Sequence, residues 1–233
     1  MPNRKWLLII LGLICFGVLG LGVAWKSAKP EPVYKDITLS VWVRGPVNTV
    51  LDGHDYPEHN KEALYAIGTN GIPFYLEWLQ YEPGRLKQAQ LFIAEKLNHW
   101  FGLDWNPNFI AARSVGAELA FTVLGPRAQV AIPTLVKYAT DSSSAMIKAR
   151  AIRALGDIGL PAVPALLTLM TNHDVSVRSL VLFQARRLDS KRQVIEQVQL
   201  LLADPSPRIR KEAGTVLDWL ENHPRPQEIQ PKE

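Results

Sequence analysis

The chain has 233 residues, of which 47% are hydrophobic, so it is long enough to bury the core of one medium-sized domain. Its formal charge of +4 comes from its first 29 residues, which hold four basic residues and no acid; the rest of the chain has 22 basic and 22 acidic residues. The surplus of cations that nucleic-acid binding needs is therefore missing beyond residue 29, and we expect no nucleic acid among the partners.

The N-terminus carries an uncharged apolar stretch over residues 6–25. As a helix it would be roughly 30 Å long, the thickness of the hydrocarbon core of a bilayer. Trp6 and Trp25 bracket it, where interfacial aromatic residues are favoured, and Arg4 and Lys5 precede it. This pattern predicts one N-terminal transmembrane helix, with a cytoplasmic N-terminus and the bulk of the chain exported.

A cleaved signal peptide is the alternative for the same stretch, because the small residues Gly22 and Ala24 could precede a cleavage site. The apolar run is longer than the about 7–15 residues usual in a signal peptide, which favours the retained anchor. We assign residues 1–29 to this anchor, or signal peptide, and its basic flanks. The protein is thus expected in a membrane, or secreted if the segment is removed.

Residues 30–60 are predicted to be an extended or loop linker. Within them, ITLSVWV (37–43) could be a short strand or an irregular segment packed by Trp42. Residues 44–60 are rich in Gly, Pro, Asn and Asp, which is typical of loops.

A repeated motif then appears in IGTNGIP (67–73), LGPRAQVAIP (124–133) and LGDIGLPAVP (155–164). Gly125 and Gly156 are expected to end a first helix, since glycine accepts the left-handed conformation there. The proline at the end of each motif suits the first turn of a second helix, where the missing N–H costs nothing. The motif therefore predicts two antiparallel helices joined by a tight turn.

The spacing of the repeats indicates a stack of such helical pairs. Ile147-Lys148, Val177-Arg178 and Ile209-Arg210 begin equivalent helices at intervals of 30 and 32 residues. A single pair exposes an apolar face unless a neighbouring pair covers it. We predict an all-α fold, an α-solenoid over residues 61–222, followed by a disordered tail over residues 223–233.

The sequence also resembles a known family. Asp174, Val177 and Arg178, with one extra residue in the spacer, and the preceding AVPALL (162–167) resemble HEAT repeats. The whole layout is similar to membrane-anchored bacterial HEAT-repeat proteins. The resemblance implies an α-solenoid that binds protein partners. It also implies a hydrogen-bonded ladder between repeats, to which we assign Asp174, Arg178, Asp204 and Arg210, with Asp141 and Lys148 as a further pair.

The resemblance further implies that second helices line a binding face, which makes Lys137 and Thr168 candidate partner contacts. Residues 85–109 interrupt the array with an amphipathic helix and an aromatic loop, and could be a degenerate repeat or a functional insertion. In that loop, Trp100 and Trp105 are candidate binding anchors, since clustered aromatic residues are typical of interfaces.

Basic residues gather in two places, on the helix that starts near Ile147 and around residues 186–192. They could form a stripe for an acidic partner, but solvated helix faces and the ladder account for them more simply. The residues concerned are Lys148, Arg150, Arg153, Arg186, Arg187, Lys191 and Arg192.

Residues that carry chemistry are sparse. The single cysteine, Cys15, lies in the apolar run, and His54 and His59 share an acidic loop with no further ligand cluster of recognisable spacing. The sequence has no phosphate-binding loop and no nucleophile elbow. We therefore expect no catalytic residue, no cofactor and no metal.

The function expected from the sequence is a membrane-tethered HEAT-repeat scaffold or adaptor that binds a protein on the exported side. The alternative is an enzyme or an enzyme-assisting protein, lyase-like, chaperone-like or base-excision-like, as the resemblance to HEAT repeats allows.

Overall fold

The computed structural model describes residues 29–44, 57–84, 92, 96, 109–188 and 191–222. The chain divides into two compact units, Met1–Glu31 and Pro32–Glu233, and all elements below belong to the second. The predicted transmembrane helix over residues 6–25 and the predicted tail over residues 223–233 lie outside the described residues.

The second unit begins with a small β-hairpin. Strand β1 (Val33–Tyr34) pairs antiparallel with β2 (Ile37–Thr38), with Val33 opposite Thr38. The two residues between the strands, Lys35 and Asp36, have φ angles of 48° and 60°. Positive φ at both positions is the conformation that lets a two-residue turn follow the twist of the strands.

A short helix, α2 (Leu39–Arg44), follows the hairpin directly. Leu39 and Val43, four residues apart and so on one helix face, are 0% and 1% exposed. Residues 39–44 are therefore not a linker, and the prediction for residues 30–60 was wrong there. Tertiary burial against α4 and α7 decides the helical conformation, which the β-branched sequence does not favour.

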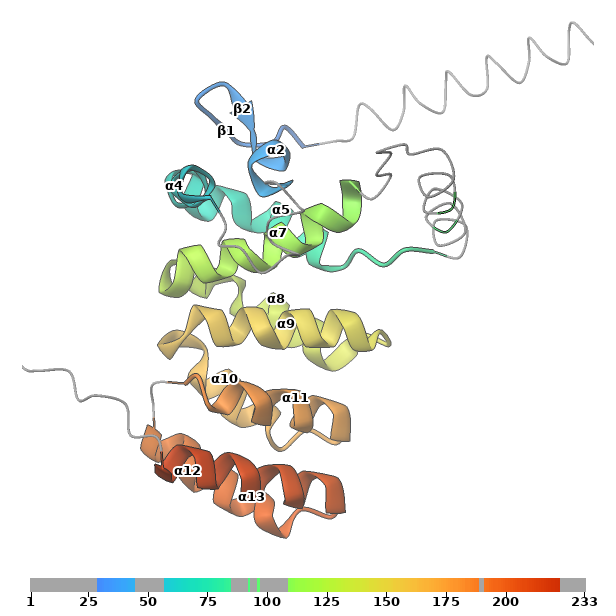
Figure 1. Ribbon diagram of the computed structural model, residues 1–233, viewed down its shortest axis with the longest axis vertical. Coiled ribbons are helices and arrows are strands. Elements are labelled where there is room, and N and C mark those ends of the chain that lie inside the picture. The colour runs from blue at the N-terminus through green and yellow to red at the C-terminus, as the bar shows by residue number, and fades with distance from the viewer. Residues whose placement is uncertain are drawn as a thin grey trace, which may run out of the picture. The chain divides into compact units, whose positions relative to one another are not determined.

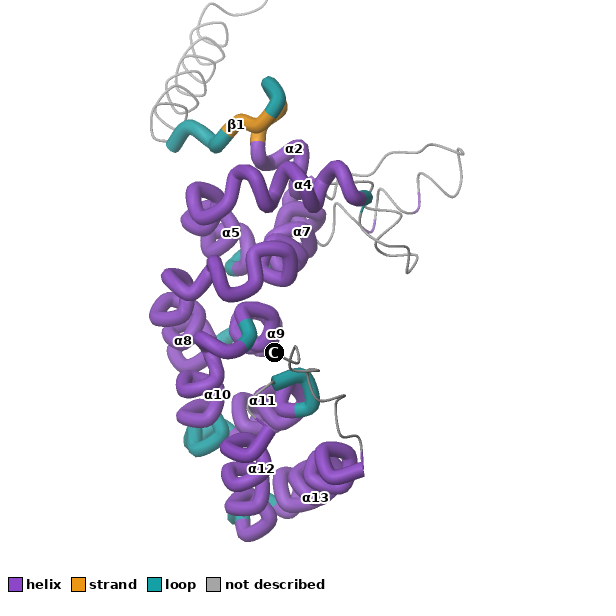
Figure 2. The backbone as a smooth tube through the Cα atoms, turned by 90° about the vertical axis from the view of Figure 1, so that its left-hand side faces the viewer, coloured by secondary structure: helices purple, strands orange, loops and turns teal. Residues whose placement is uncertain are grey.

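The rest of the unit consists of helical pairs that follow one another in chain order (Figure 1). In Figure 2, α9, α11 and α13 lie in one layer and α8, α10 and α12 in the other. The described part of the chain is thus helical apart from the hairpin and turns. The pairs are α4 (Glu58–Ile67) with α5 (Ile72–Leu79), α7 (Phe109–Leu124) with α8 (Ile132–Asp141), α9 (Ala145–Ile158) with α10 (Val163–Leu169), and α11 (Val175–Ala185) with α12 (Lys191–Leu200), followed by α13 (Pro207–Asn222).

Short 3₁₀ turns connect the two helices of the first three pairs, and a fourth one connects α12 to α13. Prolines begin the second helices α8 and α10 as predicted. Pro133 and Pro164 occupy the first turns of α8 and α10. Gly125 ends α7 with a φ of 51°. The turns are η1 (Gly68–Gly71), η2 (Gly125–Ala131), η3 (Leu160–Ala162) and η4 (Leu201–Ala203).

In the third pair the helix ends later than expected. Helix α9 continues to Ile158, and Gly159, with a φ of 77°, takes the left-handed position predicted for Gly156. Gly156 is buried inside α9, where a Cβ atom would lie 2.7 Å from the side-chain oxygen of Gln184. Its role is thus close packing of α9 against α11, and the prediction for Gly156 was wrong.

The core runs continuously from α2 to α13 between the two helical layers. Tyr75 of α5 and Phe121 of α7 are both fully buried, and their rings meet edge-on with centroids 6.1 Å apart. Each pair therefore contributes apolar side chains to an interface with the next pair, as expected for a stacked array.

Ala112–Asp141 is the one stretch among the described residues that is long and apolar enough to cross a membrane. It is not a continuous α-helix, because α7 ends at Leu124 and η2 separates it from α8. Phe121 and Leu135 within it are fully buried in the protein core. Packing between helical pairs thus accounts for the buried apolar residues of this stretch, whose most apolar window is 33% buried.

Candidate functional site

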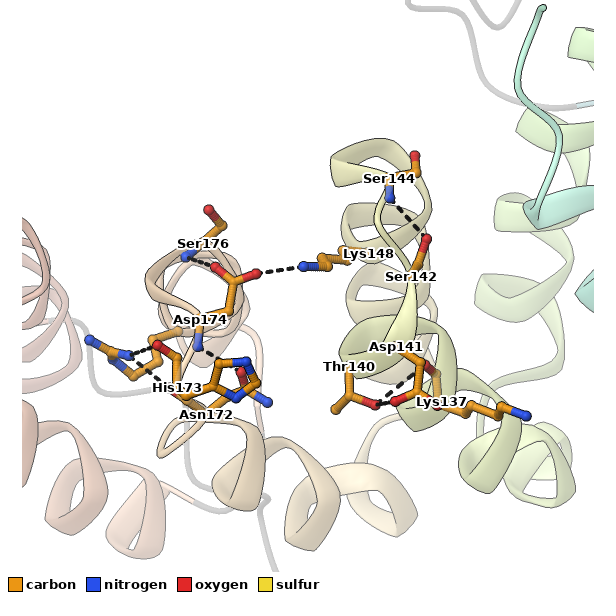
Figure 3. A network of polar contacts seen from close by, with 11 residues as sticks. Lys137, Thr140, Asp141, Ser142, Ser144, Lys148, Asn172, His173, Asp174 and Ser176 are labelled. Carbon is orange, nitrogen blue, oxygen red and sulfur yellow. Dashed lines mark hydrogen bonds and ion pairs between the residues drawn. The ribbon is translucent and has the colours of Figure 1, made fainter.

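Equivalent turns precede α9, α11 and α13, and their polar groups form the first candidate site. In each turn a side-chain oxygen, of Ser142, Asn172 or Asp204, accepts a hydrogen bond from the backbone N–H two residues later, at 3.1, 2.9 and 2.8 Å. Figure 3 shows the first two turns side by side. The three turns thus share one local structure, which fixes the entry of each first helix.

The helices that follow are also capped by side chains. Ser144 Oγ accepts the backbone N–H of Ile147 at 3.2 Å, and Asp174 Oδ1 accepts that of Ser176 at 2.8 Å. These oxygens satisfy N–H groups that have no partner within the helix.

One ion pair connects each of the turns before α11 and α13 to the preceding first helix. Lys148 Nζ of α9 donates to Asp174 Oδ2 at 2.5 Å, and Arg178 Nη2 of α11 donates to Asp204 Oδ1 at 2.8 Å. Arg210 instead bonds its own turn, donating to the carbonyl oxygens of Asp204 and Pro205 at 2.7 and 3.0 Å. The four residues assigned to the ladder, Asp174, Arg178, Asp204 and Arg210, therefore lie together at the turn edge.

The register of this ladder differs from the one expected. Asp204 is equivalent to Asn172, and not to Asp174, because each accepts the N–H two residues on and each precedes its ladder arginine by six residues. Lys148 pairs with Asp174 of the next turn, whereas Asp141 accepts a hydrogen bond from its neighbour Thr140. The expected pair of Asp141 with Lys148 was wrong.

The carboxyl groups of the ladder are stabilised in their charged form. The hydrogen bond from Lys148 and the backbone N–H of Ser176 lower the pKa of Asp174. Burial alone would raise the pKa of Asp204, but the hydrogen bonds from Arg178 and Ser206 outweigh it, so this pKa is also lowered. These carboxylates hold helical pairs together.

A second polar cluster lies between α7 and α9. Arg150 Nε and Arg153 Nη2 contact the carboxylate of Glu118 at 3.2 and 3.1 Å. Arg150, only 8% exposed, also donates to the carbonyl oxygens of Leu79 and Tyr81 at 3.2 and 2.6 Å. The arginines predicted as part of a basic stripe are therefore used between neighbouring helices.

The same layer contains a second buried carboxylate, Asp157 of α9. It accepts hydrogen bonds from Thr122 of α7 at 3.0 Å and from Arg187, just after α11, at 2.7 Å. Burial raises the pKa of both Asp157 and Glu118, and the neighbouring arginines oppose that rise. Raised carboxyl pKa values are common in active sites, but here each group is held between helices by its partners.

The candidate partner contacts on the second helices are exposed. Lys137 lies on α8 and Thr168 on α10, where the Thr168 hydroxyl donates to the Pro164 carbonyl at 3.0 Å. Trp100 and Trp105 lie outside the described residues.

An open groove of about 630 Å³ lies between α11 and α13, and sequence analysis did not identify it. The expected basic cluster supplies only one of its residues, Arg186. The signal for this groove in the sequence was the apolar residue Phe183, which the structure places at an exposed helical position. The groove is lined by Ser179, Leu180, Leu182, Phe183, Arg186, Arg208, Lys211, Glu212, Thr215 and Val216.

Within the described ranges, no group of three or more His, Cys, Asp or Glu residues is placed to hold a metal ion. His59 lies edge-on to the ring of Trp42, with centroids 6.3 Å apart, and the His173 carbonyl accepts a hydrogen bond from Arg178. His54 and His99 are outside the described residues.

Comparison with protein families identifies the central part of this stack. A family model described as HEAT repeats matches residues 110–185, which span α7 to α11. Residues 110–185 are a HEAT-repeat region. The ladder from Lys148 to Asp174 and the cluster around Glu118 and Asp157 lie within or at the borders of these HEAT repeats, and α13 continues the same arrangement beyond them. No curated protein matches the chain.

Proposed function

We propose that the protein is a membrane-tethered HEAT-repeat scaffold that binds a protein partner on the exported side of the membrane. The HEAT-repeat region carries this proposal, because HEAT repeats generally serve as surfaces for protein interaction. The uncharged residues 6–25, preceded by Arg4 and Lys5, support the tether and its orientation.

The internal use of the charged groups favours binding over catalysis. Lys148, Arg150 and Arg178 are each engaged by neighbouring helices or turns. Glu118 and Asp157 are engaged in the same way. These five ionic groups therefore hold helices in place, and what remains for a ligand is the exposed surface of the two layers.

Purification of the full chain from membranes after chemical cross-linking tests the scaffold. We expect a protein that co-purifies in a constant molar ratio and that is absent from a preparation of an unrelated anchored protein. Recovery of the chain with a bound small molecule or metal ion, and without any protein in constant ratio, would contradict the scaffold and support an enzyme.

The tether is tested separately by extraction of membranes with alkaline carbonate and by protease added to spheroplasts. The proposal expects a chain that remains in the membrane and that external protease digests. A soluble exported chain that begins near Trp25 would instead identify residues 1–24 as a signal peptide.

A further inference from the structure

We propose that the groove between α11 and α13 binds an acidic segment of a partner protein. The bound segment contributes its carboxylates and one apolar side chain to the contact. This inference rests on the proposed scaffold function, because it assigns a place and a chemistry to the partner. It is carried by the shape of the groove, by its two cations without an ion pair and by its exposed apolar side chain.

The walls of the groove come from two neighbouring first helices (Figure 2). Ser179 and Phe183 of α11 and Arg186, directly after its last residue, follow one another at intervals of four and three residues, so they share one helix face. Lys211 and Thr215 on α13 face them with the same spacing. The groove therefore runs along both helices, and an extended segment of a partner could follow it.

The corresponding interfaces earlier in this layer are bridged by charges. Glu118 joins α7 to Arg150 and Arg153 of α9, and Asp157 joins α9 to Arg187 after α11. Between α11 and α13 the bridge along the groove is a single hydrogen bond, from Arg208 to Ser179 at 3.1 Å. Among the described residues, the ion pair at this interface, from Arg178 to Asp204, lies at the turn edge, and the helix faces along the groove are joined by the hydrogen bond alone.

Its charge is positive. Arg208 Nε pairs with the one acid of the lining, Glu212, at 2.8 Å, which leaves Arg186 and Lys211. Neither of these two forms an ion pair with any described residue, and no protein acceptor lies within reach of the buried Arg186 Nε. Two uncompensated cations in one groove favour a partner with carboxylates.

The groove also has an apolar surface that suits one side chain of a bound segment. Phe183 is 64% exposed and Leu180 is partly exposed, whereas Leu182 and Val216, at 1% and 3% exposed, belong to the core beneath them. An aromatic side chain next to cations is the kind of anchor that dominates protein interfaces.

The C-terminal residues of the chain fit this groove less well than an acidic partner. Residues 223–233 hold two acids, Glu228 and Glu233, and two bases, Arg225 and Lys232. They bring no net negative charge to balance Arg186 and Lys211.

The experiment measures fluorescence anisotropy of a labelled acidic peptide that carries leucines, titrated with the detergent-solubilised full chain at low salt. The variant Arg186→Gln with Lys211→Gln is expected to weaken binding at least about tenfold, and added salt should weaken binding to the wild type. Phe183→Ser should weaken binding of the leucine-containing peptide several-fold. A peptide without leucines should bind the wild type with a similarly reduced affinity.

The matched control is Lys35→Gln, which removes an exposed cation in the turn of the β-hairpin, away from the groove. It should leave peptide binding unchanged. Circular dichroism melting of all variants checks the fold. We expect the variants of Arg186 and Lys211 to remain folded, because neither residue makes an ion pair that its substitution would break.

Equal binding by wild type and the groove variants would overturn the proposal, as would binding only to vesicles of anionic lipid and not to the peptide. Its failure can be told from failure of the scaffold. If a protein still co-purifies in constant ratio with both groove variants, the scaffold stands and its partner uses another surface.

Discussion

Gly116 shows how closely single residues control the packing of this protein. It lies in α7 where α2 crosses, and a Cβ atom there would collide with the carbonyl oxygen of Val43. Only glycine allows the backbones to approach this closely.

We expect Gly116→Ala to destabilise the protein by about 1–3 kcal/mol, because a backbone atom, and not a flexible side chain, must move. The measurement is chemical denaturation, with hydrogen exchange to follow the amides of α2, which should lose protection first. An unchanged free energy of unfolding would show that α2 does not pack on α7 as described.

Arg178 is the residue whose loss should disturb the ladder most. It is 8% exposed and bonds Asp204, which is 7% exposed, as well as the carbonyl oxygens of Asn172 and His173. Arg178→Ala leaves a buried carboxylate without its cation and should cost about 3 kcal/mol at neutral pH. Arg192→Ala, which breaks the exposed pair with Glu196, is the control and should leave the unfolding curve nearly unchanged.

The same contact predicts a pH dependence. The folded-state pKa of Asp204 is lowered below its ordinary value of 3.8, so its contribution to stability is complete above that pH and is lost as the pH falls through the folded pKa. The difference in unfolding free energy between wild type and Arg178→Ala should therefore shrink below about pH 4. A difference that stays constant from pH 7 to pH 3 would contradict the assigned ion pair.

At the scale of the element, the turns within the helical pairs depend on glycine conformation. Gly159 ends α9 at a φ of 77°, whereas Gly214 lies inside α13, where an added Cβ atom would make only an ordinary contact at 3.9 Å with Leu202. We expect Gly159→Ala to destabilise by about 1–2 kcal/mol and Gly214→Ala to stabilise by about 0.5–1 kcal/mol. Thermal melting of both variants measures this, and equal shifts in one direction would contradict the turn assignment.

The elements also show how far the sequence predicts the structure. The pattern of glycine and proline identified the turns before α8 and α10, because these residues act through local backbone geometry. It misplaced the end of α9, because Gly156 is required by Gln184, 28 residues later in the chain. Helix α2 was missed for the same reason, since burial against α4 and α7 determines it.

The candidate sites, too, divide into one that the sequence indicated and one that depends on contacts between distant parts of the chain. The ladder residues were assigned from the resemblance to HEAT repeats, although the register of Asp204 depends on turn geometry. The groove between α11 and α13 could not be predicted, because Phe183 and Lys211 come together only when two helical pairs stack.

At the scale of the whole unit, stability should pass between neighbouring helical pairs, since each pair buries its apolar face on the next. Arg178→Ala should therefore speed amide exchange in α11, α12 and α13 while α4 and α5 keep their protection. Faster exchange by the same factor in all helices would indicate a single cooperative unit.

The proposed scaffold binds a protein on the exposed surface of the helical stack, of which residues 110–185 are a HEAT-repeat region. Hydrogen exchange of the full chain, alone and with the protein that co-purifies from membranes, tests it most directly. We predict that binding slows exchange along α11 and α13 and leaves the buried faces of α7 and α9 unchanged. Exchange that remains the same in every helix from α4 to α13 would contradict the claim.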